Sequence, residues 1–303
     1  MDRRSFTRNL AGAALGAAAL ASTTSTHASP PTAQTPLKLS VMLWTVFRHL
    51  PFEQRLEKVS DAGYHHVELV GEFKKWSAAD WDHFSKKKRS LGMTFDATSG
   101  VNASLADPSQ RPAFLSQVRE MLPVMDKLEC PTLIVLSGNT VPGLMREAQH
   151  ESCIEGLRQA SELIKGRQNL RILLENIDPE ENPHIFLWSV AEGFEITRAV
   201  NNPQIKLLYD FYHEQIAEGN LIEKLEKNID QVGLVHIADV PGRHEPGTGE
   251  IHYPNIIKTL AQLGYSHYAA MEYLPTYDGV QSLRNSRRMA LESAQAPTPS
   301  PAT

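Results

Sequence analysis

The sequence has few cysteines and an excess of acidic over basic residues, and both features limit what the protein can be. Its two cysteines, Cys130 and Cys153, cannot form a disulfide framework. One bridge stays open, but two buried free thiols are favoured. The formal net charge of −5 argues against a nucleic-acid-binding surface, which normally carries a basic patch. No glycine-rich phosphate loop follows the first predicted strand, which weakens the case for a dinucleotide-binding fold.

An apolar stretch near the N-terminus is too short and too rich in alanine for a stable membrane span. Arg3 and Arg4 precede an Ala/Leu/Gly run over 10–21, and small residues continue through Ala28. This order is typical of a twin-arginine export signal. No cysteine follows the run, which argues against a lipid anchor. We therefore expect residues 1–36 to be an export signal and linker, without a stable membrane anchor, and the mature protein to be periplasmic.

Short apolar runs alternate with stretches of helical spacing from Leu37 to about Ala294. Each run has the composition of a strand buried on both faces. The predicted strands are 37–44, 66–70, 93–97, 132–136, 171–176, 205–209, 233–238 and 268–273. Eight such units without a break in composition predict one (β/α)₈ barrel over 37–294, followed by a disordered tail over 295–303. A doubly wound open sheet is the alternative.

Four of the late strands end on a residue that can bind a metal or move a proton: Glu175, Asp210, His236 and Glu272. A barrel of parallel strands brings these ends together in one pocket. Three carboxylates and one imidazole form a cage of hard ligands suited to Mg²⁺ or Mn²⁺. For any one of these carboxylates a structural ion pair is the alternative, because a buried charge must be paired or metal-bound.

Three further residues are candidates for substrate contact. His213 lies three residues after Asp210 and can turn toward the same pocket mouth, although a loop histidine that caps a helix would look the same. Glu68 ends the second strand and could contact substrate, support the ligands or form a structural pair. Arg243 lies in the long Pro/Gly-rich segment 239–250, where barrel enzymes place binding groups. Its guanidinium can hold a carboxylate through two parallel hydrogen bonds, or the loop can simply be rigid and exposed.

The most specific motif is the segment 237–254, which includes PGRHEPGTGE at 241–250, and it is followed by LGY at 263–265 and EY at 272–273. With these motifs, nearly the whole mature chain resembles the xylose isomerase-like TIM barrels, and most closely their hydroxypyruvate isomerase group. The resemblance implies that Glu175 and Glu272 are the paired catalytic glutamates. It also implies that the metal positions are Glu175, Asp210, His236 and Glu272.

The implied reaction converts hydroxypyruvate to tartronate semialdehyde by metal-assisted enediolate proton transfer between two glutamates. Two features depart from that group. Typical hydroxypyruvate isomerases have Gln at the position of His236, whereas the related ketose 3-epimerases have His. The segment 68–76 also differs from the loop expected after the second strand. With the export signal, His236 favours the alternative of a periplasmic ketose 3-epimerase, or of a lyase or isomerase that acts on an oxidised 3-keto sugar.

Two other classes of function fit less well. A DNA-repair endonuclease of related architecture would need further histidine and acidic ligands for a multi-zinc cluster, together with a basic face. A non-catalytic sugar-binding barrel would need no metal ion, so metal content separates it from an enzyme. The expected partner is a small hydroxy-keto acid or a sugar, with no nucleic acid, and a homo-oligomer is left open.

The N-terminal pattern generates a first prediction. Replacing Arg3 and Arg4 together by Lys should leave the precursor in the cytoplasm, because the twin-arginine pair is the feature that the export machinery reads. Immunoblotting of periplasmic and cytoplasmic fractions measures this. Unchanged export of the double variant would mean that another route is used.

Overall fold

The protein forms a closed barrel of eight parallel strands in sequence order. The computed structural model describes residues 37–296, so the expected export signal and residues 297–303 of the expected tail lie outside the described residues. The strands are β1 (Lys38–Met42), β2 (His66–Leu69), β3 (Thr94–Ser99), β4 (Thr132–Leu136), β5 (Arg171–Glu175), β6 (Ile205–Asp210), β7 (Val232–Ile237) and β8 (Tyr268–Met271). Pairing of β1 with β8 closes the barrel, which confirms the predicted (β/α)₈ fold and excludes the open sheet.

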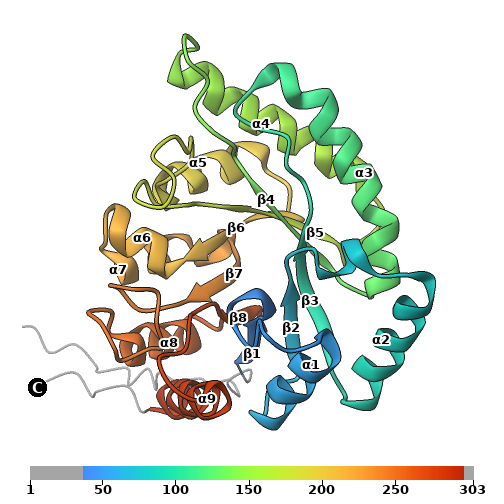
Figure 1. Cartoon of the computed structure of the whole chain (residues 1–303). Coiled ribbons are helices and arrows are strands. Elements are labelled where there is room, and N and C mark those ends of the chain that lie inside the picture. The colour runs from blue at the N-terminus through green and yellow to red at the C-terminus, as the bar shows by residue number, and fades with distance from the viewer. Residues whose placement is uncertain (1–36, 297–303) are drawn as a thin grey trace, which may run out of the picture. The chain divides into compact units, whose positions relative to one another are not determined.

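Helices surround the strands on the outside of the barrel (Figure 1). The α-helices of the described residues are α1 (Phe52–Asp61), α2 (Ala78–Ser90), α3 (Arg111–Leu128), α4 (Arg146–Leu163), α5 (Val190–Val200), α6 (Phe211–Ala217), α7 (Leu221–Asn228), α8 (Tyr253–Gln262) and α9 (Gly279–Gln295). Short 3₁₀ helices are η1 (Leu43–Thr45), η2 (Glu72–Lys75), η3 (Pro108–Gln110) and η4 (Ile229–Gln231). The last helix extends one residue into the segment expected as tail. Within residues 37–296, no helix is both long and apolar enough to cross a membrane.

Three strands end one or two residues away from their predicted ends, and this changes where Trp44, Asp210 and Glu272 lie. The first strand was expected to reach Trp44, but β1 ends at Met42 and Trp44 belongs to η1. At the last strand β8 ends at Met271, so Glu272 follows the strand. Asp210 is instead the final residue of β6, one residue beyond the expected end, and it also caps α6 through its side chain. These positions place side chains at the carboxyl-terminal rim of the barrel.

Two apolar cores support this rim. Five residues from β3 to β7 fill the inside of the barrel: Ala97, Ile134, Leu173, Leu208 and Leu234. A larger core lies between the outer faces of the strands and the helices, and it contains both cysteines as free, buried thiols, as the sequence favoured. Because β5, β6 and β7 are buried along nearly their whole length, they provide a rigid base for the residues at their ends.

The long loop between β7 and α8 is held by one buried carboxylate. Both oxygens of Asp239 accept backbone N–H bonds, from Val240 and Ile251 at 3.0 Å and from Gly247 at 2.8 Å. A Cβ on Gly249 would lie 2.0 Å from the Val240 carbonyl oxygen, so only glycine fits there. The loop expected to carry a binding group is therefore an ordered segment with fixed backbone contacts.

Candidate metal centre and active site

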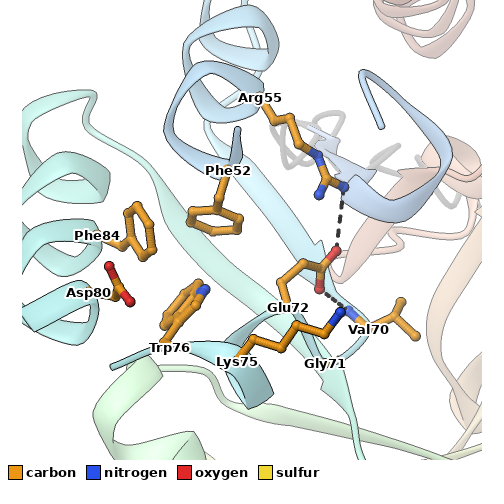
Figure 2. Close-up of a pocket in the computed structure, with 9 residues that line it drawn as sticks. All are labelled: Phe52, Arg55, Val70, Gly71, Glu72, Lys75, Trp76, Asp80 and Phe84. Atoms are coloured by element: carbon orange, nitrogen blue, oxygen red, sulfur yellow. Dashed lines mark hydrogen bonds and ion pairs between the residues drawn. The ribbon is translucent and has the colours of Figure 1, made fainter. Parts of the chain in front are cut away.

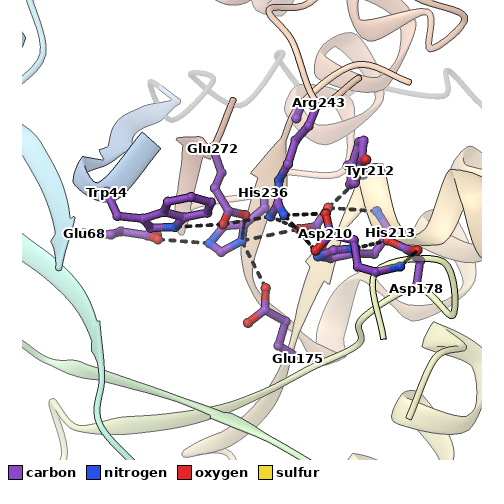
Figure 3. Close-up of polar contacts among 12 residues, drawn as sticks. Trp44, Glu68, Glu175, Asp178, Asp210, Tyr212, His213, His236, Arg243 and Glu272 are labelled. Carbon is purple, nitrogen blue, oxygen red and sulfur yellow. Dashed lines mark hydrogen bonds and ion pairs between the residues drawn. The ribbon is translucent and has the colours of Figure 1, made fainter. Parts of the chain in front are cut away.

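The four residues expected to bind a metal converge at the rim of the barrel (Figure 3). Asp210 on β6 and His236 on β7 are direct neighbours in the strand register. Glu175 ends β5, and Glu272 follows β8. All four side chains are buried, and one ligand atom from each lies within 4.8 Å of the other three. Sequence reasoning from strand ends thus located a real cluster.

The atoms that face one another are short of hydrogen-bond partners. His236 Nδ1 lies 2.8 Å from Glu272 Oε2, 3.3 Å from Glu175 Oε1 and 3.6 Å from Asp210 Oδ2. Within the described residues, His236 Nδ1, Asp210 Oδ2 and Glu272 Oε2 are buried and make no hydrogen bond. Unpaired buried polar atoms are costly, and here they point to one location. Three carboxylate oxygens and an imidazole nitrogen fit a divalent cation that would occupy it.

Glu175 and Glu272 differ in their hydrogen-bond partners and in the direction in which their pKa values are shifted. Burial alone would raise the pKa of Glu272, but His236 and Arg243 lower it below its ordinary value. Its Oε1 accepts a hydrogen bond from Trp44 Nε1 at 3.2 Å and lies 2.8 Å from Arg243 NH2. Burial raises the pKa of Glu175, whose Oε1 lies 3.3 Å from His236 Nδ1. Within residues 37–296, neither Trp44 nor Arg243 contacts its carboxylate as they contact that of Glu272. Glu272 is thus held as an anion, whereas Glu175 can more readily accept a proton.

Glu68 lies behind His236, on the side away from the other ligands. Its side chain is fully buried, and its Oε2 lies 3.0 Å from His236 Nε2. Of the three roles left open for Glu68, support of the ligands fits this position best, because the carboxylate faces the imidazole and is absent from the cavity wall. Donation of Nε2–H to Glu68 would make Nδ1 the ring nitrogen that binds a cation. Burial alone would lower the pKa of His236, yet Glu272 and Glu68 raise it well above its ordinary value.

His213 is linked to a carboxylate that sequence reasoning missed. Its Nδ1 lies 2.5 Å from Asp178 Oδ2, and its Nε2 lies 3.5 Å from Asp210 Oδ2. Burial would lower the pKa of His213, but Asp210 and the bond to Asp178 raise it to about 9. Asp178 also accepts the N–H groups of Glu180 and Glu181, so it fixes the turn after β5. In the sequence, the only indication of this contact was that Asp178 is a polar residue three positions after the end of β5.

Arg243 reaches the cluster from the loop after β7, where its backbone adopts a left-handed φ of 56°. The guanidinium lies between two aromatic rings, 5.6 Å from the Trp44 centroid and 5.1 Å from the Tyr212 centroid. Its NH1 lies 2.8 Å from Glu181 Oε1, and its NH2 faces Glu272. Neither aromatic residue nor Glu181 was identified from the sequence, because their roles depend on loop conformation. Arg243 belongs to the site as expected, but acids of the protein already surround it.

A cavity of about 420 Å³ opens onto these residues, with Glu175, Glu272, His213 and Arg243 in its wall. Apolar side chains make up much of the remaining wall: Met42, Trp44, Val70, Val101, Ile134, Leu136 and Ile177. Another groove, of about 500 Å³, lies between α1 and α2 and contains none of the candidate ligands (Figure 2). The candidate ligands and a cavity therefore coincide only at the first of these two.

Comparison with known proteins agrees with this architecture. The family described as xylose isomerase-like TIM barrel matches residues 56–293. A 2-oxo-tetronate isomerase from Pectobacterium atrosepticum is 29% identical over 254 residues, which cover 80% of this chain and 95% of that protein. The hydroxypyruvate isomerase of Escherichia coli is 27% identical over 246 residues, which cover 79% and 94%. A crystal structure titled AP endonuclease, family 2, from Brucella melitensis has a TM-score of 0.75 at 28% identity and covers 82% of this chain and 96% of that chain.

Replacing Asp210 by Asn separates metal binding from folding. The amide oxygen of Asn can still accept the N–H bonds of Tyr212 and His213, which Asp210 Oδ1 now accepts at 2.8 and 3.1 Å. The variant should fold but should bind Mn²⁺ at least about a hundredfold more weakly, because it loses a charged ligand. Isothermal titration with Mn²⁺ and circular dichroism measure the two properties. Unchanged Mn²⁺ affinity would contradict the assignment of Asp210 as a ligand.

Replacing Glu68 by Ala tests its contact with His236. Loss of the acceptor should free the imidazole ring and weaken Mn²⁺ binding by about ten- to a hundredfold, the usual effect of losing such a partner. Glu68→Gln keeps an acceptor oxygen and should weaken binding less. The nitrogen chemical shifts of His236 report which ring nitrogen carries the proton. If both variants bind Mn²⁺ as tightly as the unmodified protein, Glu68 only fills space.

Proposed function

The chain belongs to the xylose isomerase-like TIM barrel family, and from that premise we propose that it is an isomerase of small hydroxy-keto acids. The reaction we favour converts hydroxypyruvate to tartronate semialdehyde by moving a proton between neighbouring carbons. Isomerases that match most of this chain, and most of their own length, support it. The single structural observation that carries it is the pair of unlike glutamates at one cavity: Glu272 is held as an anion by Trp44 and Arg243, and Glu175 contacts neither of these residues.

The residues divide the work in the proposed mechanism. Glu175 takes the proton from the carbon beside the substrate carbonyl and returns it to the former carbonyl carbon, because its carboxylate is accessible in the cavity and burial raises its pKa. Glu272 starts as an anion beside Arg243, accepts the proton of the substrate hydroxyl and gives it to the former carbonyl oxygen. His213 has Nδ1 engaged by Asp178, so its Nε2–H is the group that can donate to a substrate oxygen. Arg243 holds Glu272 in its ionised form.

A divalent ion, Mg²⁺ or Mn²⁺, would be held by the four ligands: Glu175, Asp210, His236 and Glu272. When bound, it supplies Lewis-acid stabilisation of the negative charge that develops on the substrate oxygens. The donor set supports an oxygen-preferring ion, since three of the four ligands are carboxylates. The apolar part of the cavity wall limits access of water to the developing charge.

A second candidate is a ketose 3-epimerase, or an enzyme acting on a 3-keto sugar. The imidazole of His236 among the ligands favours it, as does a cavity of about 420 Å³, which is large for a three-carbon acid. Both candidates move a proton next to a carbonyl, so the same glutamates would act in each. Turnover of a panel of hydroxy-keto acids, ketoses and 3-keto sugars in D₂O distinguishes them by which substrate incorporates deuterium.

We further propose that the enzyme works in the periplasm, on the N-terminal sequence pattern alone.

An endonuclease remains less well supported, although one similar structure carries that title. The second acidic group of the described residues, Asp178, Glu181 and His213, is satisfied internally. Asp178 pairs with His213, and Glu181 pairs with Arg243. Within residues 37–296 these contacts leave one cluster with unpaired ligand atoms, whereas a multi-metal site needs further free ligands beside it. The net charge of −5 also gives no general attraction to a phosphate backbone.

Glu175→Gln and Glu272→Gln should each reduce turnover by about 10³-fold or more, because each carboxylate serves both the ion and the proton transfer. Solvent deuterium incorporation into hydroxypyruvate measures the proton step directly. A matched control is Glu214→Gln, a fully buried glutamate that pairs with Lys224 away from the cavity. Near-normal turnover in either active-site variant would overturn the two-glutamate mechanism.

A further inference from the structure

The cations that sequence reasoning assigned to substrate binding are already neutralised by the protein. The guanidinium of Arg243 has Glu181 on NH1 at 2.8 Å and Glu272 on NH2 at 2.8 Å. His213 has Nδ1 bonded to the buried Asp178. A substrate carboxylate that approached Arg243 would have to displace Glu181 and would face Glu272. An acidic substrate therefore needs another cation in this cavity.

We infer that Lys74 is the residue that recognises the acid group of the substrate. This assignment rests on the proposed function and adds to it, since it makes a free carboxylate a requirement for tight binding. Lys74 lies in the wall of the catalytic cavity and is exposed there. Within residues 37–296 its ammonium has no ion pair and no hydrogen bond, in contrast to Arg243 and His213. It is thus the cation of the cavity wall whose charge is still available.

The loop that carries Lys74 is anchored, so the lysine stem has a defined origin. Glu72 Oε2 accepts the Val70 N–H at 2.6 Å, and Glu72 Oε1 lies 3.5 Å from Arg55 NH2. Gly71 has a left-handed φ of 94°, and a Cβ there would lie 3.1 Å from Lys74 Cε. Glycine therefore leaves the space that the lysine stem occupies. This is the segment after the second strand that departs from the expected family pattern.

The neighbouring lysine provides a matched control. Lys75 belongs to the same short helix, η2, and is also exposed. It lies in the wall of the other groove, beside Phe52, Trp76 and Phe84, and not in the wall of the catalytic cavity (Figure 2). Lys74 and Lys75 thus carry the same charge, belong to the same short helix and are both exposed, but they line different cavities. Any general effect of removing a surface charge should appear in both variants.

The test compares two probes that differ only in their terminal group. Glycerate carries a carboxylate, and glyceramide is its neutral amide of nearly the same shape. Titration of the Mn²⁺-loaded protein gives the affinity for each, so the result does not depend on turnover. Lys74→Gln should weaken glycerate binding roughly tenfold, the scale of one charge-assisted hydrogen bond. Glyceramide affinity should not change, and Lys74→Arg should keep most of the preference for glycerate.

Kinetics and salt dependence complete the design. For hydroxypyruvate, Lys74→Gln should raise KM about tenfold with little change in kcat, because the lost contact binds substrate and transition state alike. Raising the salt concentration should weaken glycerate binding in the unmodified protein more than in Lys74→Gln. Lys75→Gln should match the unmodified protein in every measurement. Circular dichroism checks that each variant is folded.

The outcomes separate this inference from the proposed reaction. If hydroxypyruvate is not a substrate but Lys74→Gln still loses glycerate affinity selectively, the reaction is wrong and the role of Lys74 stands. If hydroxypyruvate turns over and Lys74→Gln leaves both glycerate affinity and KM unchanged, the role of Lys74 is overturned. An equal loss in Lys74→Gln and Lys75→Gln would overturn it too, since that result indicates a diffuse charge effect.

Discussion

The arrangement of the active site depends on the crowding of like charges around one buried imidazole. Glu175, Asp210 and Glu272 all place an oxygen within 3.6 Å of His236 Nδ1, while Glu68 contacts its other nitrogen. Carboxylates in a dry interior repel one another strongly and cannot all remain charged without compensation. The positive charges of Arg243 and His213 offset part of this repulsion. A divalent cation would offset the rest, which gives a physical reason for so many acids to share one site.

A barrel of parallel strands can hold such a cluster because each ligand comes from a different strand end. The adjacency of β6 and β7 sets Asp210 beside His236, and the apolar interior core beneath them excludes rearrangement. Asp210 adds a second constraint, because one of its oxygens caps α6 while the other faces the cluster. The side chain is thereby fixed in direction before any metal or substrate arrives. The strand ends therefore hold the carboxylates close together despite their mutual repulsion.

The sequence predicted the parts of this site that depend on periodicity. Buried strands that end in an acid or a histidine can be recognised without coordinates, and Glu175, Asp210, His236 and Glu272 were found in that way. Glu68 was recognised by the same rule, but its role stayed open, because alternation along a strand does not reveal which neighbour a side chain meets across the barrel. Trp44 and Asp178 were missed for a different reason. Their contacts depend on a 3₁₀ turn and on a loop, and local pattern does not predict either conformation.

Strand ends and loops also contribute different groups to the candidate site. The candidate metal ligands, including the two glutamates of the proposed reaction, lie at strand ends, where register and core packing fix them. The groups that would meet the far end of a substrate, such as Lys74 and Leu136, lie on loops or at exposed strand ends. Loops can change length and sequence at little cost to the core. Two chains can therefore share the metal cluster and differ in substrate. In this chain, the segment after β2 carries the lysine that we propose for recognition of the acid group.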